Sequence, residues 1–240
     1  MPVIACLHTA DSNAAVFDAA LAAAGLPGAV LRHLVRPGLL RAAEAAGGPT
    51  PDILRAAADE LQGLAQGADV VLLTCSTLGP AAALARAGVP VLRVDAALAQ
   101  EAVRGGGDVV VLCATATTLE PTRALFEDAA RGTGARVAVR LVPGAWAAFL
   151  AGDQDGYWAL VAEAADAAAA DGASEGQAGA GPTRAGRAGS DSSAAGGVRV
   201  VLAQASMAGA AGLARCRPLT SPGAGLRAAI EAATAGTGRG

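Results

Sequence analysis

Short apolar runs alternate with longer amphipathic stretches along most of this chain. The apolar runs have the length and β-branched content of buried strands, and they cover residues 3–7, 70–73, 89–94, 108–113, 136–141 and 198–203. The stretches with helical character cover residues 14–24, 52–66, 96–103, 120–131, 154–170 and 224–233. Strands that alternate with helices are typical of parallel sheets covered on both faces. The pattern therefore predicts an α/β protein.

Residues 171–197 interrupt this alternation. They consist almost wholly of Gly, Ala, Ser, Asp, Arg and a few other polar types, and they include no large apolar residue. Such a segment has nothing to bury, so we predict a disordered insertion. The chain of 240 residues is long enough for two lobes. We expect the first lobe over residues 1–95, completed by about 218–240, and the second over 96–217 with the insertion inside it.

Residues typical of helix starts precede two of the predicted helices. Asn13 can cap the first helix, and Thr50-Pro51 places a cap residue and a first-turn proline before the second. Residues 81–87 can carry a further helix after the run at 70–73.

Hydroxyl-rich segments follow four of the predicted strands. The run at 70–73 changes abruptly into Thr74-Cys-Ser-Thr77, and similar ends lie at 9–12, 115–118 and 204–206. Because the carboxyl ends of parallel strands share the edge where ligands bind, we expect these loops to converge on one cleft. Helix-start N–H groups there can hold an anion and can lower the pKa of a thiol. The alternative for Cys75 is a buried core position, since free Cys is among the most buried residue types.

Composition excludes several classes of function. The net charge is −3 and charged residues make up 16 %, which argues against nucleic acid as the main partner. We find no unbroken apolar run long enough to span a membrane, and Met1 leads directly into a strand without signal-peptide features, so we expect a cytoplasmic protein. All 18 basic residues are arginine, which excludes a Schiff-base lysine and a P-loop lysine.

The four cysteines are widely spaced and form no C-x-x-C pair. Only His8 and His33 could join them as ligands, so the spacing argues against a structural zinc site and we predict no metal. Cys6 and Cys113 lie inside apolar runs, and we expect both to be reduced core residues.

The four loops together resemble the aspartate/glutamate racemase superfamily, which includes hydantoin racemases, maleate isomerases and arylmalonate decarboxylases. Thr74-Cys-Ser-Thr77 is similar to its first cysteine motif, and Val200–Ala208 is similar to its second. Further similarities lie at Asp11-Ser12, Thr115, Thr118 and Leu219-Thr-Ser-Pro222.

The resemblance implies two similar lobes with the active-site cleft between them, and it implies a homodimer. It also implies cofactor-independent chemistry on a small carboxylic or dicarboxylic acid, in which one thiolate removes a proton and a second thiol returns one to the opposite face. Carried over to this chain, it makes Cys75 the catalytic residue and gives the substrate-binding residues as Asp11, Ser12, Ser76, Thr77, Thr115, Thr118, Gln204 and Ser206.

One departure from the family pattern affects the mechanism. Gln204 stands where the second cysteine belongs, and an amide cannot act as a general acid or base at physiological pH. A symmetric two-thiol racemase therefore does not fit, and three interpretations stay open. The first is an isomerase or lyase that uses Cys75 alone, for example a one-thiol decarboxylase. The second is a racemase that uses water or a neighbouring side chain opposite Cys75, and the third is a carboxylate-binding protein without catalysis.

Other candidates have structural interpretations. Asp11 is expected to hydrogen-bond locally in its turn more than to act as a base, and His8 is expected to be structural. Four aromatic residues are expected to pack a helix against the sheet or a dimer partner, with a lid over the substrate as the alternative: Trp146, Phe149, Tyr157 and Trp158.

Overall fold

The computed structural model describes residues 1–23, 28–177 and 197–237. Its eight strands form two four-stranded parallel sheets. In the first sheet the order is β2 (Val30–Val35), β1 (Val3–His8), β3 (Val70–Leu73) and β4 (Val91–Arg93). In the second the order is β6 (Ala135–Leu141), β5 (Gly107–Cys113), β7 (Arg199–Leu202) and β8 (Leu219–Thr220).

The two sheets share one topology. In each, the first strand of the lobe lies centrally, between the second strand on one side and the third on the other. Every pairing is parallel, and the central strands are almost completely buried. The predicted fold of two similar α/β lobes is therefore confirmed.

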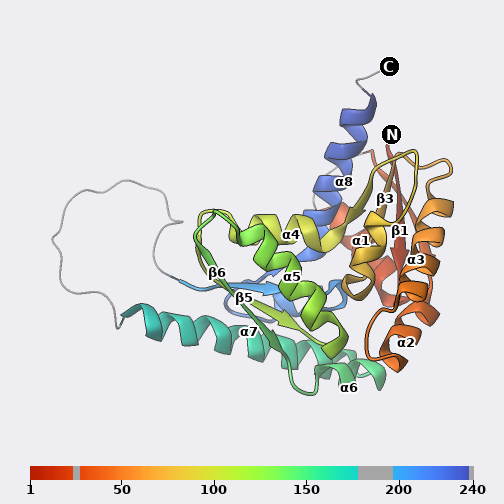
Figure 1. The fold of residues 1–240 in the computed structure, drawn as a ribbon. Helices are drawn as coiled ribbons and strands as arrows, with labels where there is room; N and C mark the ends of the chain where they lie inside the picture. Colours follow the sequence, from red (N-terminus) through yellow and green to blue (C-terminus); the bar gives the residue numbers. More distant parts are fainter. Residues whose placement is uncertain (24–27, 178–196, 238–240) are drawn as a thin grey trace.

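Helices cover the sheets of both lobes (Figure 1). The α-helices are α1 (Ser12–Ala23), α2 (Pro37–Ala45), α3 (Pro51–Leu64), α4 (Val94–Val103), α5 (Leu119–Ala130), α6 (Ala145–Leu150), α7 (Gln154–Gln177) and α8 (Ser221–Thr237). Three 3₁₀ segments follow central strands: η1 (Ser76–Ala83), η2 (Ala116–Thr118) and η3 (Ala205–Gly212). Within the described ranges, no helix combines the length and apolar character needed to cross a membrane.

Two helices are exchanged between the lobes. α8 follows the last strand of the second sheet, yet its Leu226 packs with Ile4 and Val70 of the first sheet. α4 follows the last strand of the first sheet, yet its Leu98 packs with Val109 of the second. The exchange joins the two lobes through a continuous apolar interface.

The structure also corrects several sequence-based boundaries. The strand at 30–35 and the helix at 37–45 were not predicted, because Arg32 and His33 break the apolar run of an edge strand. Residues 171–177 continue α7, which shortens the predicted insertion; the remainder, 178–196, lies outside the described residues.

Predictions of helix starts near the strand ends have different outcomes. Thr50 caps α3 as expected, since its side chain accepts a hydrogen bond from the Ile53 N–H. Asn13 is not a cap, because α1 already begins at Ser12. The expected helix at 81–87 is a 3₁₀ segment that starts earlier, at 76, and it contains Pro80, which has no N–H to donate to an α-helical ladder.

Candidate active site

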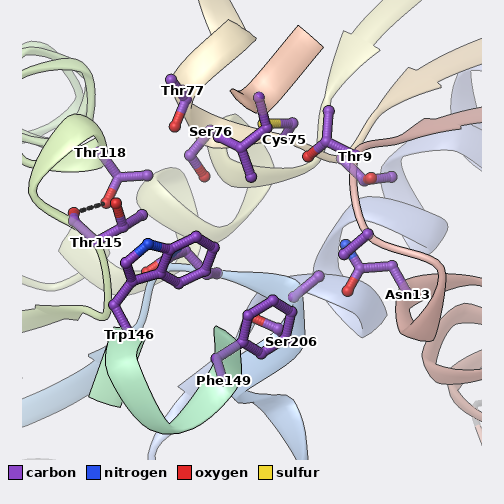
Figure 2. A pocket seen from close by; sticks show the side chains of 15 residues that line it. Thr9, Asn13, Cys75, Ser76, Thr77, Thr115, Thr118, Trp146, Phe149 and Ser206 are labelled. Atoms are coloured by element: carbon purple, nitrogen blue, oxygen red, sulfur yellow. Dashed lines mark hydrogen bonds between the residues drawn. The ribbon is translucent and has the colours of Figure 1, made fainter. Parts of the chain in front are cut away.

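One pocket lies where the carboxyl ends of the central strands of both lobes meet (Figure 2). Its free volume is about 40 Å³, which is room for a small ligand or a few waters. Its lining comes from the β1 end (Thr9, Ala10, Asn13), α2 (Leu40), the β3 end (Thr74, Cys75, Ser76, Thr77), the β5 end (Thr115, Thr118), α6 (Trp146, Phe149) and the β7 end (Gln204, Ala205, Ser206).

The two lobes present equivalent backbone to this pocket. The Thr74 N–H donates to Leu7 O at 3.1 Å in the first lobe, and the Ala203 N–H donates to Leu112 O at 3.0 Å in the second. The next residue in each lobe, Cys75 or Gln204, is extended and precedes a 3₁₀ segment of eight residues. Gln204 is therefore the structural counterpart of Cys75, as the alignment with the second cysteine motif predicts.

Cys75 lies partly exposed at the pocket, at the start of η1. Burial in the protein raises the pKa of its thiol above the usual value. The Thr9 hydroxyl and the N–H groups of Leu78 and Thr77 oppose this shift, because they hydrogen-bond to the sulfur, while the Asp95 carboxylate adds to it. The net direction is upward, so the resting thiol keeps its proton at neutral pH and can donate it.

The side chain of Gln204 is engaged in a hydrogen bond to the backbone. Its side-chain Oε1 accepts a hydrogen bond from the backbone N–H of Ala114, at the end of β5. This bond links the end of β7 to the end of β5 and holds the side-chain carbonyl of Gln204 against the Ala114 N–H. The second lobe therefore presents a neutral, oriented amide where the first presents a thiol.

Ser206 lies two residues beyond Gln204 and is anchored from behind. Its Oγ is 2.9 Å from the hydroxyl of Tyr157, and its carbonyl accepts from Trp158 Nε1 at 3.1 Å. Tyr157 is completely buried, and this burial raises the pKa of its hydroxyl to about 12. Tyr157 and Trp158 thus pack in the core of the second lobe, as expected for aromatic residues of this stretch.

Hydroxyl groups line the wall between the lobes. Thr77 Oγ1 lies 3.4 Å from Thr117 Oγ1, which is 3.1 Å from Thr115 Oγ1. Thr118 donates its hydroxyl to Thr115 O at 2.7 Å, and Ser76 Oγ reaches Ala203 O at 3.5 Å. These contacts hold the two strand-end loops together, and the four lining residues Ser76, Thr77, Thr115 and Thr118 are all buried.

The opposite side of the pocket is apolar. Trp146 and Phe149, on α6, stack with ring centroids 5.0 Å apart and an interplanar angle of 12°, and both line the pocket together with Leu40 of α2 (Figure 2). Trp146 also hydrogen-bonds to Glu44 of α2, whose carboxyl pKa is raised by burial. For these two aromatic residues the structure therefore favours the alternative of a cover over the pocket.

Seven of the nine residues predicted for the site line this one pocket: Cys75, Ser76, Thr77, Thr115, Thr118, Gln204 and Ser206. Asp11 and Ser12 do not line it, and both are exposed. Their loop contributes Thr9 and Asn13 instead, because the turn directs Asp11 outward and places Asn13 in the first turn of α1. Asn13 is 6 % exposed, and its Oδ1 has no hydrogen-bond partner in the part of the chain that the structure describes.

Sequence reasoning missed Leu40, since α2 was not predicted, and it assigned no pocket role to Asn13. Asp11, Ser12 and Asn13 are consecutive polar residues, so the sequence does not indicate which of the three side chains turns toward the pocket. Among the lining residues no side chain is charged, and the only strong metal ligand is Cys75. The pocket thus suits a ligand held by neutral hydrogen-bond donors.

Solved structures with a similar fold were found by comparison. An aspartate racemase from Picrophilus torridus superposes with a TM-score of 0.67 at 12 % identity, over 98 % of this chain and 95 % of that one. The chain has the two-lobed fold of an aspartate racemase. An aspartate racemase homologue from Pyrococcus horikoshii has a TM-score of 0.58 at 16 % identity, over 98 % of this chain and 100 % of the other. No family model and no curated sequence matches.

Proposed function

We propose that this protein is a cofactor-independent enzyme that acts at the α-carbon of a small carboxylic acid, with Cys75 as its only acid/base thiol. The observation that carries the proposal is the pairing of Cys75 with Gln204 at equivalent positions of one pocket. A thiol on one face and an amide on the other permit proton transfer on one face only.

The hydroxyl wall suits the carboxylate of such a substrate. Thr115 and Ser206 contribute hydroxyl groups to the lining, and η1 begins directly after Cys75. Neutral donors of this kind can stabilise the negative charge that develops when an α-carbanion delocalises into its carboxylate. They do so without a lysine, which this chain lacks.

The protonation state of Cys75 favours donation over abstraction. Burial raises the pKa of the thiol, so at neutral pH the resting residue is an acid. A thiol that starts protonated suits a carbanion generated by loss of CO₂, because that step needs no base. In a substrate with two carboxylates, the second would lie against Leu40, Trp146 and Phe149, where no lining residue is a cation. An apolar wall destabilises this charge and therefore favours its loss as neutral CO₂. Decarboxylation with protonation by Cys75 is therefore the reaction that the site supports best.

The test uses 2-substituted malonic acids and the corresponding monocarboxylic acids in D₂O, followed by NMR. We expect loss of CO₂ from the malonates and incorporation of one deuterium at the α-carbon in a single configuration. Cys75→Ala should abolish turnover, while Cys216→Ala, which removes another partly exposed free thiol, should not change it.

The other outcomes separate the remaining functions. Exchange of the α-proton of the monoacids with inversion would replace this proposal with a racemase that uses a second group opposite Cys75. Protection of Cys75 from iodoacetamide by these acids, without exchange or CO₂ loss, would indicate a carboxylate-binding protein.

A further inference from the structure

A second cluster of reactive side chains lies in the first lobe, behind the pocket wall. Cys6 and His8 are two residues apart on β1, so their side chains share one face of the sheet. His33 on β2 pairs directly with Cys6 in the strand register. One ligand atom of each residue can therefore be chosen such that all three lie within 4.8 Å of one another.

The hydrogen bonds around the two imidazoles define which nitrogen atoms carry protons. The Thr74 hydroxyl donates to Leu7 O at 2.9 Å, so it accepts from His8 Nδ1, at 2.8 Å. This leaves His8 Nε2 as a bare lone pair, and it faces His33 Nδ1 at 2.8 Å.

His33 cannot satisfy both of its neighbours with a single proton. Its Nε2 lies 3.2 Å from the Asp18 carboxylate, which only accepts, and its Nδ1 faces the lone pair of His8. A neutral His33 has one N–H, so one of these two contacts lacks a proton. A cation between the two imidazoles would allow His33 Nε2–H to donate to Asp18 and would also occupy both facing lone pairs.

The third member of the cluster indicates what kind of cation fits. A shared proton would need only the two nitrogens, whereas here a thiol lies beside them. One Cys and two His are ligands that Zn²⁺ and similar ions accept. Each imidazole also has the outer hydrogen bond that usually orients a metal-bound histidine, from His8 to Thr74 and from His33 to Asp18.

We propose that Cys6, His8 and His33 bind a thiophilic divalent transition-metal ion of the Zn²⁺ type. Binding displaces the thiol proton of Cys6 to solvent, and the thiolate and two neutral imidazoles form three bonds to the ion. A water molecule completes a tetrahedral set on the side of His33, whose side chain is 18 % exposed. The facing nitrogens must separate to about 3.3 Å for such geometry. His33 lies on an edge strand, so it can move by this amount.

The location of the proposed metal site indicates a structural role and not a catalytic one. Cys6 and His8 are completely buried, and none of the three ligands lines the pocket. Thr74 connects the two sites, because it lines the pocket and also accepts the hydrogen bond from His8. A bound ion would thus fix the loop that carries Cys75 without taking part in chemistry there.

Metal binding can be tested without knowing the substrate. Protein stripped with a chelator is titrated with Co²⁺ under reducing conditions, and absorption spectra are recorded. We expect one equivalent to give a thiolate-to-cobalt charge-transfer band and tetrahedral d–d bands, both removed by one equivalent of Zn²⁺. Tm should rise in proportion to the logarithm of free Zn²⁺ above saturation.

Matched variants assign the band to this cluster. Cys6→Ala should remove the charge-transfer band, and His33→Gln, at the partly exposed position, should weaken Co²⁺ binding at least tenfold while the protein stays folded. The double variant Cys75→Ala/Cys216→Ala, which removes the two partly exposed thiols, should keep the full spectrum. The proposal is overturned if the charge-transfer band is absent at millimolar Co²⁺, if it survives Cys6→Ala, if His33→Gln leaves affinity unchanged, or if the double variant loses it.

Discussion

Gln204 occupies in the second lobe the position that Cys75 occupies in the first. Both residues follow the third strand of their sheet, both are extended, and both precede a 3₁₀ segment of eight residues. Cys75 interacts with Thr9 at the end of β1, and Gln204 accepts from Ala114 at the equivalent end of β5. The backbone at these two positions is thus equivalent, whereas one side chain is a thiol and the other a neutral amide.

Restoring a thiol at this position should restore two-face proton transfer. Gln204→Cys is expected to cause α-proton exchange with inversion in acids that the parent protein binds, because an acid/base group then faces each side of the α-carbon. The loss of the bond to Ala114 should cost about 1 kcal/mol of unfolding free energy. Gln204→Ser, which loses the same bond without adding a thiol, is the control. Equal exchange rates in both variants would refute the expectation.

The alkylation rate of Cys75 should report its raised pKa. The thiolate is the reactive form, so iodoacetamide labelling should still increase about tenfold per pH unit at pH values where an unperturbed thiol has levelled off. Cys6 and Cys113, both fully buried, should label more slowly than Cys75 in the native state. Mass spectrometry of digested samples gives all rates at once. A plateau of the Cys75 rate below pH 8 would contradict the direction of the shift.

The single tyrosine permits a direct titration of the residue behind Ser206. Tyr157 is the only tyrosine in the chain, and burial raises its pKa from 10.0 to about 12. Near-ultraviolet tyrosinate absorbance should therefore rise near pH 12 in native protein and near pH 10 in urea. Between these values the unfolded state binds fewer protons, so stability falls as pH rises, by up to roughly 3 kcal/mol. Tyr157→Phe should remove the share of this loss that comes from the tyrosine, while the buried thiols, whose pKa values are also raised, continue to contribute to the pH slope. An identical pH slope in this variant would exclude Tyr157 as a contributor.

The cover formed by α6 should control access to Cys75. Trp146→Ala removes a pocket wall, so labelling of Cys75 by a bulky maleimide should accelerate at least fivefold. Leu150→Ala is the matched control, since Leu150 lies on the same helix and is 66 % exposed. Equal acceleration in both variants would indicate a general loosening of α6 instead of an opened pocket.

The segment 178–196 should be dispensable for folding. It has no large apolar residue, so we expect its removal to delete no large apolar side chain from the core. Replacing it by a short Gly-Ser linker is expected to change Tm by only a few degrees, as measured by thermal unfolding monitored by circular dichroism. A matched deletion of 171–177, which shortens α7 and removes the Asp171 partner of Arg140, should cost more. Loss of soluble protein on deleting 178–196 would contradict this interpretation.

The class of fold and most of the pocket lining could be predicted from the pattern of residues along the chain. Apolar runs and helical periodicity are visible in residues close together in the sequence, so they predict strands and helices directly. In a parallel sheet, the carboxyl ends of all strands lie at the same edge. The hydroxyl-rich segments at 74–77, 115–118 and 204–206 could therefore be assigned to one cleft from their places after predicted strands. The replacement of a thiol by Gln204 could also be recognised, since it depends only on residue identity within a motif.

Which of two neighbouring side chains turns inward depends on the packing of the folded chain and could not be predicted. The fold settles this for the loop after β1. Asn13 lines the pocket while Asp11 is exposed, because α1 begins one residue earlier than the expected cap. It also brought together Cys6 and His33, which are 27 positions apart in sequence yet directly paired between strands. The proposed metal site depends on this pairing, which sequence spacing does not reveal because it measures distance along the chain. Strand register determines distance in space, and it depends on how the whole first lobe packs.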